Sequence, residues 1–255
     1  MQLIDTHAHL DHLEDVDGAL SRAYEAGVKG VIAVGVDLAA NKKNLAIKRR
    51  TRRPKVYVAL GIHPGNISPA EVDETLQFIR ANIKEAVAVG ETGLDYWYKW
   101  VKKDEVKKQE QRDVFQKQLE LAKEFDLPVV MHSRGAWADC LKLAKAAGIK
   151  KGLFHWYSGP VDILQEILDA GYFVSASLSV AHSPQSRAAM THAPIERTLI
   201  ETDSPVNYTD GENSFQTEPR DVFRTLKAYS TLKNIPQEKA AEILTKNAET
   251  FFDLI

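Results

Sequence analysis

The chain has 255 residues, with 33 Lys and Arg against 35 Asp and Glu, which gives a formal net charge of −2. This balance excludes a protein held on nucleic acid by net charge alone. A hydrophobic content of 44% with 27% charged residues indicates a folded globular chain. The single cysteine, Cys140, excludes an intrachain disulfide and predicts a reducing compartment, the cytoplasm. With no signal peptide and no apolar run of about 18 residues, we expect no membrane segment.

Short apolar segments alternate with longer segments of helical period along the whole chain. The expected strands are residues 2–5, 30–34, 56–60, 86–89, 128–131, 152–154, 172–175 and 198–200. The expected helices include residues 16–26, 71–83, 109–124, 137–147 and 161–170, with a final helix in 236–255. Three of these helices are followed by a glycine, which readily adopts the left-handed conformation of a helix C-cap.

Each expected strand is apolar on both faces, as in parallel sheets that helices cover on both sides. Eight such strands, each followed by a helix and without a linker or repeat, predict an α/β fold, a single-domain TIM (β/α)8 barrel over residues 1–255. An open doubly wound sheet also alternates, but it usually has fewer strands and a glycine-rich phosphate turn after the first. Here the first strand leads into Asp5-Thr6-His7-Ala8-His9 instead.

Polar residues follow six of the expected strands, at the end where TIM barrels place their reactive groups. They are His7, His9, His63, Glu91, His132, Arg134, His155, Glu201 and Asp203. Five of the eight histidines belong to this set, and scattered surface histidines would not gather in this way. We expect the other three, His12, His182 and His192, to be ordinary hydrogen-bonding residues.

The pair His7 and His9 indicates a metal site, because alternate residues of an extended segment point to the same side. Glu91 lies between two groups of histidines in barrel order and can bridge two ions. One divalent ion is therefore assigned to His7, His9, Glu91 and Asp203, and a second to Glu91, His132 and His155. Ligands of this kind, without thiolate, suit Zn2+, Mn2+, Fe2+, Ni2+ or Mg2+. Two ions about 3.5–4 Å apart would activate a shared water.

Four segments resemble the signature blocks of the TatD-family metal-dependent deoxyribonucleases. They are Asp5-Thr6-His7-Ala8-His9-Leu10-Asp11, Gly61-Ile62-His63-Pro64, Gly90-Glu91-Thr92-Gly93-Leu94-Asp95 and Glu201-Thr202-Asp203-Ser204-Pro205. The resemblance implies a TIM barrel of the amidohydrolase superfamily with a divalent-metal site. It also implies phosphodiester hydrolysis, typically 3′-to-5′ exonuclease action on DNA. Two departures are Trp156-Tyr157, where relatives often have Cys-Phe, and residues 206–218, which lack a Pro- and Arg-rich run.

Each polar residue at a strand end has an expected role and an ordinary alternative. Asp203 is expected to bind metal and act as general base, and Glu91 to bind metal, rather than to be a turn or loop acid. His63 is expected to hydrogen-bond a phosphate oxygen or the leaving group, with a structural histidine as the alternative. Arg134 either presents its guanidinium to a phosphate or forms a salt bridge in the barrel mouth. Glu201 is expected near the substrate, positioning His63 or a nucleotide.

The segment Tyr96-Trp97-Tyr98-Lys99-Trp100, which four lysines follow at 102, 103, 107 and 108, has the composition of a nucleic-acid contact. Trp97 and Trp100 are expected to stack on the bases of a DNA substrate that is single-stranded or has free ends. The alternative is an apolar lid packed on the barrel rim. A basic run over residues 38–55 lies on the helix after the second strand, where we expect a solvated face.

Three functions fit these patterns. The first is a deoxyribonuclease of the 3′-to-5′ exonuclease type with two divalent ions, Mg2+, Mn2+ or Zn2+. The second is a metal-dependent hydrolase of an ester or amide such as D-aminoacyl-tRNA, and the third is a metal-stabilised binding protein with little turnover. The sequence leaves open the metal, the strand polarity and the oligomeric state.

Overall fold

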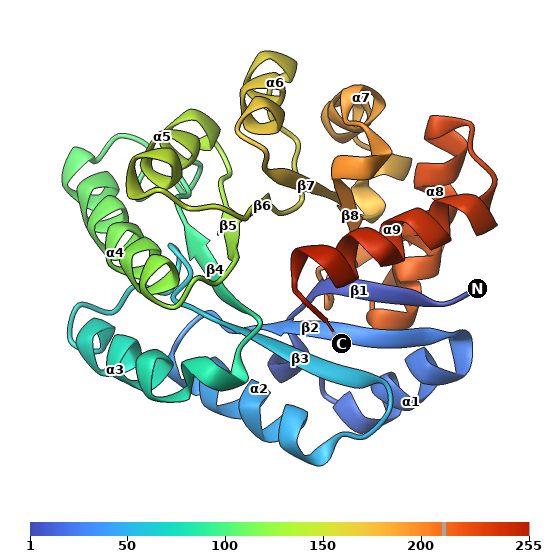
Figure 1. The fold of residues 1–255 in the computed structure, drawn as a ribbon, viewed down its shortest axis with the longest axis horizontal. Helices are drawn as coiled ribbons and strands as arrows, with labels where there is room; N and C mark the ends of the chain where they lie inside the picture. The colour runs from blue at the N-terminus through green and yellow to red at the C-terminus, as the bar shows by residue number, and fades with distance from the viewer. Residues whose placement is uncertain (211–212, 255) are drawn as a thin grey trace.

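The computed structural model describes residues 1–210 and 213–254, and it centres on a ring of eight parallel strands (Figure 1). The strands follow chain order around the ring, each paired in parallel with the next. They are β1 Leu3–Ala8, β2 Val28–Val34, β3 Lys55–Leu60, β4 Ala88–Gly93, β5 Val129–His132, β6 Gly152–Phe154, β7 Phe173–Ala176 and β8 Thr198–Ile200. All eight predicted strands and the predicted single-domain barrel are confirmed.

Helices lie around the outside of the ring, between successive strands (Figure 1). They are α1 Val16–Ala26, α2 Leu38–Arg50, α3 Val72–Asn82, α4 Glu105–Glu124, α5 Trp137–Ala147, α6 Val161–Asp169 and α7 Pro184–His192, with α8 Val222–Lys233 and α9 Gln237–Phe251 after β8. Short 3-10 helices are η1 Leu10–His12, η2 Ile83–Glu85, η3 Leu178–Ala181, η4 Ile195–Arg197 and η5 Pro219–Asp221. No helix in the described part of the chain is long and apolar enough to cross a bilayer.

The helices before Gly27 and Gly148 end where predicted, and the helix before Gly171 ends one residue earlier, at Asp169. Gly27 after α1 and Gly148 after α5 both have left-handed φ angles, 105° and 76°, and close the last helical turn. Helix α4 begins earlier than predicted, at Glu105 rather than at residue 109. The Asp104 side chain caps that earlier start by accepting bonds from the N–H groups of Val106 and Lys107.

Strands β1, β4 and β5 run further than predicted, and this brings three expected metal ligands inside strands. Strand β1 continues to Ala8, which pairs with Ala33, so His7 lies within it. Strand β4 continues to Gly93, which pairs with His132, so Glu91 lies within it. Strand β5 ends at His132 itself, and the other predicted site residues lie just past the ends of their strands. A hairpin of β9 Asn207–Asp210 and β10 Asn213–Gln216, which the sequence did not predict, follows β8.

One end of the barrel is apolar and the other is polar. Inside the ring, an apolar cluster joins one residue or more from seven of the strands to the end of α9. Phe251 and Phe252 are each 2% exposed and belong to this cluster, so the end of the chain plugs the barrel on the side of the strand N-termini. The polar residues are left to the opposite end.

Strands β8 and β1 close the ring without a regular ladder. An isolated parallel bridge joins Ala8 to Ser204. Next to it, the buried Asp5 carboxylate accepts bonds from the Thr202 N–H at 2.9 Å and the Thr202 hydroxyl at 2.6 Å. Burial raises the pKa of Asp5 well above its usual range, and the bonds from Thr202 and His7 offset this only in part. These side-chain bonds therefore add to the two backbone bonds across the seam, from the His9 N–H to Ser204 and from the Asp203 N–H to His7.

Replacing Thr202 by valine should lower the free energy of unfolding by about 1–3 kcal/mol, because it leaves a buried carboxylate oxygen without its donor. Urea denaturation measures this change. The control is T231V, on the exposed surface of α8, which should stay within about 0.5 kcal/mol of the wild type. Equal losses in the two variants would show that Asp5 and Thr202 do not hold the seam.

Candidate metal centre

A cavity of about 460 Å3 opens among residues at the carboxyl ends of the strands. Its lining includes seven residues singled out from the sequence, namely His9, His63, Glu91, His132, Arg134, His155 and Asp203. It also includes residues with no predicted role in binding, namely His12, Val36, Asn66, Ser133, Trp137, Trp156 and Ser158. The barrel thus gathers the expected reactive groups in one place.

The first group of candidate ligands surrounds one oxygen of Glu91. His7 Nε2 lies 3.2 Å and His9 Nε2 3.5 Å from Glu91 Oε2. The same two nitrogens lie 3.4 and 3.2 Å from Asp203 Oδ1. Asp203 takes a left-handed φ of 52°, and its N–H donates to the His7 carbonyl at 2.9 Å, which brings its side chain to β1. These four residues are the set expected for the first ion.

The second group surrounds the other oxygen of the same carboxylate. His132 Nδ1 and His155 Nε2 each lie 2.9 Å from Glu91 Oε1 and 3.3 Å from one another. These three residues are the set expected for the second ion. Since Glu91 is 2% exposed and points one oxygen at each group, its carboxylate lies between them as a bridging ligand would.

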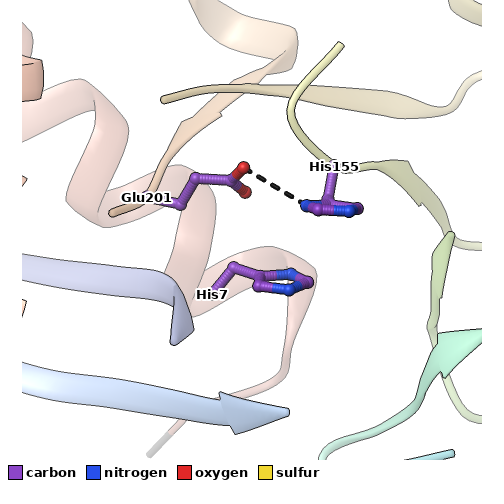
Figure 2. A group of neighbouring side chains, drawn as sticks. All are labelled: His7, His155 and Glu201. Atoms are coloured by element: carbon purple, nitrogen blue, oxygen red, sulfur yellow. Dashed lines mark hydrogen bonds and ion pairs between the residues drawn. The ribbon is translucent and has the colours of Figure 1, made fainter. Parts of the chain in front are cut away.

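Each histidine of the second group is held from behind by a buried carboxylate. Asp95 Oδ2 lies 2.8 Å from His132 Nε2, and Glu201 Oε1 lies 3.3 Å from His155 Nδ1. Figure 2 shows the Glu201 carboxylate reaching the His155 ring, which is stacked on His7 with ring centroids 4.0 Å apart. Carboxylates in this position fix the tautomer of a metal-binding histidine and raise its basicity. The structure thus places Glu201 behind His155, fully buried, rather than against His63 or a nucleotide.

Charge compensation decides the protonation of these buried groups. Burial would raise the pKa of Glu91, but the imidazoles around it, His155 first, hold it well below its usual range. Burial would likewise lower the pKa of His155, but Glu91 and Glu201 raise it well above its usual range. For His9, the adjacent Asp203 carboxylate outweighs burial and raises the pKa to about 9. For His63 burial dominates and lowers the pKa to about 3.

His63 lies beside the second group, with Nε2 3.6 Å from Glu91 Oε1. Its Nδ1 accepts a bond from the Gly65 N–H at 3.0 Å, so the proton of the neutral ring is on Nε2. A protonated nitrogen donates hydrogen bonds and does not bind metal. Although Glu91, His63 and His132 are close enough to hold an ion, this tautomer favours the hydrogen-bonding role that the sequence predicts for His63.

The donor set fits divalent metal ions. Contacts of 2.9–3.5 Å between ligand atoms match ions with bonds of 2.0–2.2 Å, whose ligands lie roughly 3–3.5 Å from one another. Asp203 Oδ1 is buried and makes no hydrogen bond within the described residues, and the same holds for Nδ1 of His7 and of His9. A buried carboxylate oxygen among imidazole nitrogens without a hydrogen bond is the environment that a cation satisfies.

The remaining predicted substrate residues lie at the rim. Arg134 donates from Nε at 2.9 Å and Nη2 at 2.8 Å to Asp95, and its guanidinium lies 5.1 Å from the Tyr98 ring centroid. It thus forms the salt bridge of the alternative interpretation while also lining the cavity. Trp97 and Trp100 are 60% and 49% exposed and do not line the cavity. Such exposure suits an open platform better than a packed lid.

Sequence reasoning overlooked Asp95, although it closes one of the four signature segments. This residue is fully buried, and its two oxygens contact His132, Arg134 and the N–H of Trp97. One carboxylate therefore ties together a candidate metal ligand, the cation at the rim and the start of the aromatic segment. The signal in the sequence is its place at the end of the segment Gly90–Asp95, four residues after Glu91.

Three comparisons with known proteins agree with this geometry. The family model described as TatD related DNase matches residues 4–253. Deoxyribonuclease TATDN3 of Homo sapiens is 31% identical over 98% of this chain and 94% of its own length. The metal-dependent hydrolase YcfH of Escherichia coli is 29% identical over 100% of this chain and 97% of its own length. The solved structure of YJJV, a TatD homologue from Escherichia coli, is 27% identical, covers 99% of this chain and 98% of its own, and has a TM-score of 0.88.

Replacing Asp95 by asparagine should weaken divalent-ion binding by about 10–100-fold, because His132 loses the carboxylate that orients it. Isothermal titration of the metal-free protein with Mn2+ or Zn2+ measures the affinity. D162N, which changes an exposed acid at the start of α6, is the matched control and should bind as the wild type does. Equal affinities in D95N and D162N, with both variants folded, would contradict a role for Asp95 in holding the ligand.

Proposed function

The chain belongs to the TatD-related DNase family and is a metal-dependent hydrolase of ester bonds, and on that premise we propose that it removes nucleotides from DNA ends as a 3′-to-5′ exonuclease. The observation that carries the proposal is the buried Glu91 carboxylate, which points one oxygen into each of two ligand groups beside a cavity. This arrangement supports two divalent ions, Mg2+, Mn2+ or Zn2+.

The proposed ligands are those of the two groups. One ion would be held by His7, His9, Glu91 and Asp203, and the other by Glu91, His132 and His155. When bound, the ions would supply positive charge that polarises the scissile phosphate and makes a water more acidic. The buried carboxylates Asp95 and Glu201 hold His132 and His155 in orientation for this.

The chain's own residues would move the protons. Asp203 is 15% exposed and lines the cavity, so its carboxylate can take the proton of the attacking water. His63 presents Nε2–H toward the cavity and would donate a hydrogen bond to a phosphate oxygen or to the leaving oxygen. Within the described residues, Arg134 Nη1 makes no hydrogen bond, which leaves it for a phosphate.

The DNA strand would leave the cavity over the aromatic segment. Trp97 has Lys102 Nζ 4.9 Å from its ring centroid, and Trp100 is stacked on Tyr98 with centroids 5.4 Å apart. Exposed indoles beside lysines bind single strands by stacking and charge, without sequence preference. The basic run of α2 is less suited to binding DNA, because Arg49 pairs with Glu85 and Arg50 with Asp17.

Cleavage of DNA tests the proposal directly. Single-stranded DNA labelled at its 3′ end, incubated with Mg2+ or Mn2+, should release labelled mononucleotides with wild type. D203N and E91A should lower kcat/KM by at least about 100-fold, because general base catalysis alone supplies about 10²–10⁴-fold. Cleavage of an aminoacyl-tRNA or ester without cleavage of DNA would replace this proposal by the ester or amide hydrolase. No turnover of either substrate would favour a binding protein.

The aromatic segment gives a separate prediction. W97A and W100A should each raise KM for oligonucleotides by about 5–150-fold, because a stacked base contributes about 1–3 kcal/mol. The same variants should leave KM for a small phosphodiester unchanged, since it cannot reach the rim. Steady-state kinetics with both substrates measure the two values. Equal effects on both substrates would mean that the indoles support folding rather than stacking.

A further inference from the structure

The lining of the cavity includes two half-buried tryptophans, here termed the indole wall, to which the proposed reaction assigns no part. Trp137 is the first residue of α5, and Trp156 directly follows the candidate ligand His155. We infer that this wall binds the base of the terminal nucleotide, so that the enzyme recognises a DNA end by stacking beside the metal centre. The inference rests on the proposed function and adds to it a base-binding subsite.

The position of Trp156 is set by the network that holds the candidate ligand. Its backbone is left-handed, with φ of 43°, a conformation that costs a non-glycine residue free energy and persists only where neighbours impose it. The Trp156 N–H donates to Ser175 Oγ at 2.9 Å, and that hydroxyl donates to Glu201, which also contacts His155. The backbone that carries the Trp156 indole therefore has a defined place relative to the candidate ligand His155.

Trp137 is positioned by close packing on the same loop. Its ring meets Tyr157 edge to face at 64°, with centroids 6.3 Å apart. Tyr157 is 1% exposed, and its hydroxyl donates to the Pro160 carbonyl at 2.7 Å. A Cβ atom at Gly159 would lie 2.8 Å from Trp137 and 2.7 Å from Tyr157, so only glycine allows this approach. The Trp137 indole is thus held in place by its packing, and Trp156 by its backbone.

The rest of the lining specifies the ligand class. The volume of about 460 Å3 lies within the range of about 300–1,000 Å3 typical of small-molecule sites. Ser133 and Ser158 also line the cavity and offer hydroxyls, and Arg134 offers a cation for phosphate. A flat aromatic group joined through a polar unit to a phosphate at the metal centre satisfies all three features. A nucleotide has this composition, and stacking on indole accepts any of the four bases.

Cleavage should therefore depend on whether the terminal nucleotide carries a base. A strand whose last nucleotide lacks its base keeps the phosphate contacts and loses the stacking. The wild-type kcat/KM should therefore be about 5–150-fold higher for an oligonucleotide with an intact 3′-terminal base than for the same oligonucleotide ending in an abasic residue. Base identity should have a much smaller effect.

Variants of the two tryptophans test the assignment. In W156A and W137A the ratio between the two oligonucleotides should fall toward one, whereas W156F, which keeps an aromatic ring, should retain much of it. Y24A removes an exposed aromatic side chain from α1, outside the cavity lining, and should keep the wild-type ratio. Thermal melting of each variant shows whether it is folded.

The outcomes separate the inference from the proposed function. If the wild type cleaves both oligonucleotides equally well, or W156A and W137A keep the wild-type ratio, the base subsite is refuted and the exonuclease stands. If the wild type cleaves neither oligonucleotide, the exonuclease is refuted, and nucleotide binding then tests whether the base subsite exists. In that case quenching of tryptophan fluorescence should show wild type binding dAMP more tightly than 2-deoxyribose 5-phosphate, and W156A binding both alike. Equal affinities in the wild type would overturn the inference.

Discussion

The carboxylate of Glu91 is a buried negative charge whose compensation organises the whole mouth of the barrel. A charge without water around it is tolerated only when paired groups surround it. Histidines from β1, β5 and the end of β6 supply that pairing, and each oxygen of Glu91 serves a different group. Gly61, which directly follows β3, makes room for this arrangement, because a Cβ atom there would lie 2.6 Å from the Glu91 carbonyl oxygen.

Further charged and polar groups surround the histidines that pair with Glu91. Asp95 and Glu201 stand behind the histidines of the second group, and each of them also contacts a residue further out, Arg134 or Ser175. The ligands are thus connected to the walls that would hold a substrate, and a displaced ligand would move the wall with it. Such support is what keeps a site within the small tolerances that catalysis needs.

Stability and reactivity are separated along the barrel axis. At one end of the ring, Phe251 at the end of α9 and Phe252 after it bury apolar surface. This end stabilises the fold and carries no reactive group. The other end holds buried acids and imidazoles whose desolvation is unfavourable for folding. TIM barrels tolerate this because residues at the bottom face serve stability while the loops at the top serve chemistry.

The sequence by itself determined the barrel and the set of candidate ligands, because strand periodicity and polar residues after apolar runs are local signals. It also indicated Glu91 as a bridge, from its place between two histidine groups. Only the tertiary structure decided that Glu201 supports His155, that Asp95 joins His132 to Arg134, and that Trp137 and Trp156 rather than Trp97 and Trp100 line the cavity. Those relations depend on which side chains meet across loops from different strands, and no spacing along the chain encodes such distances.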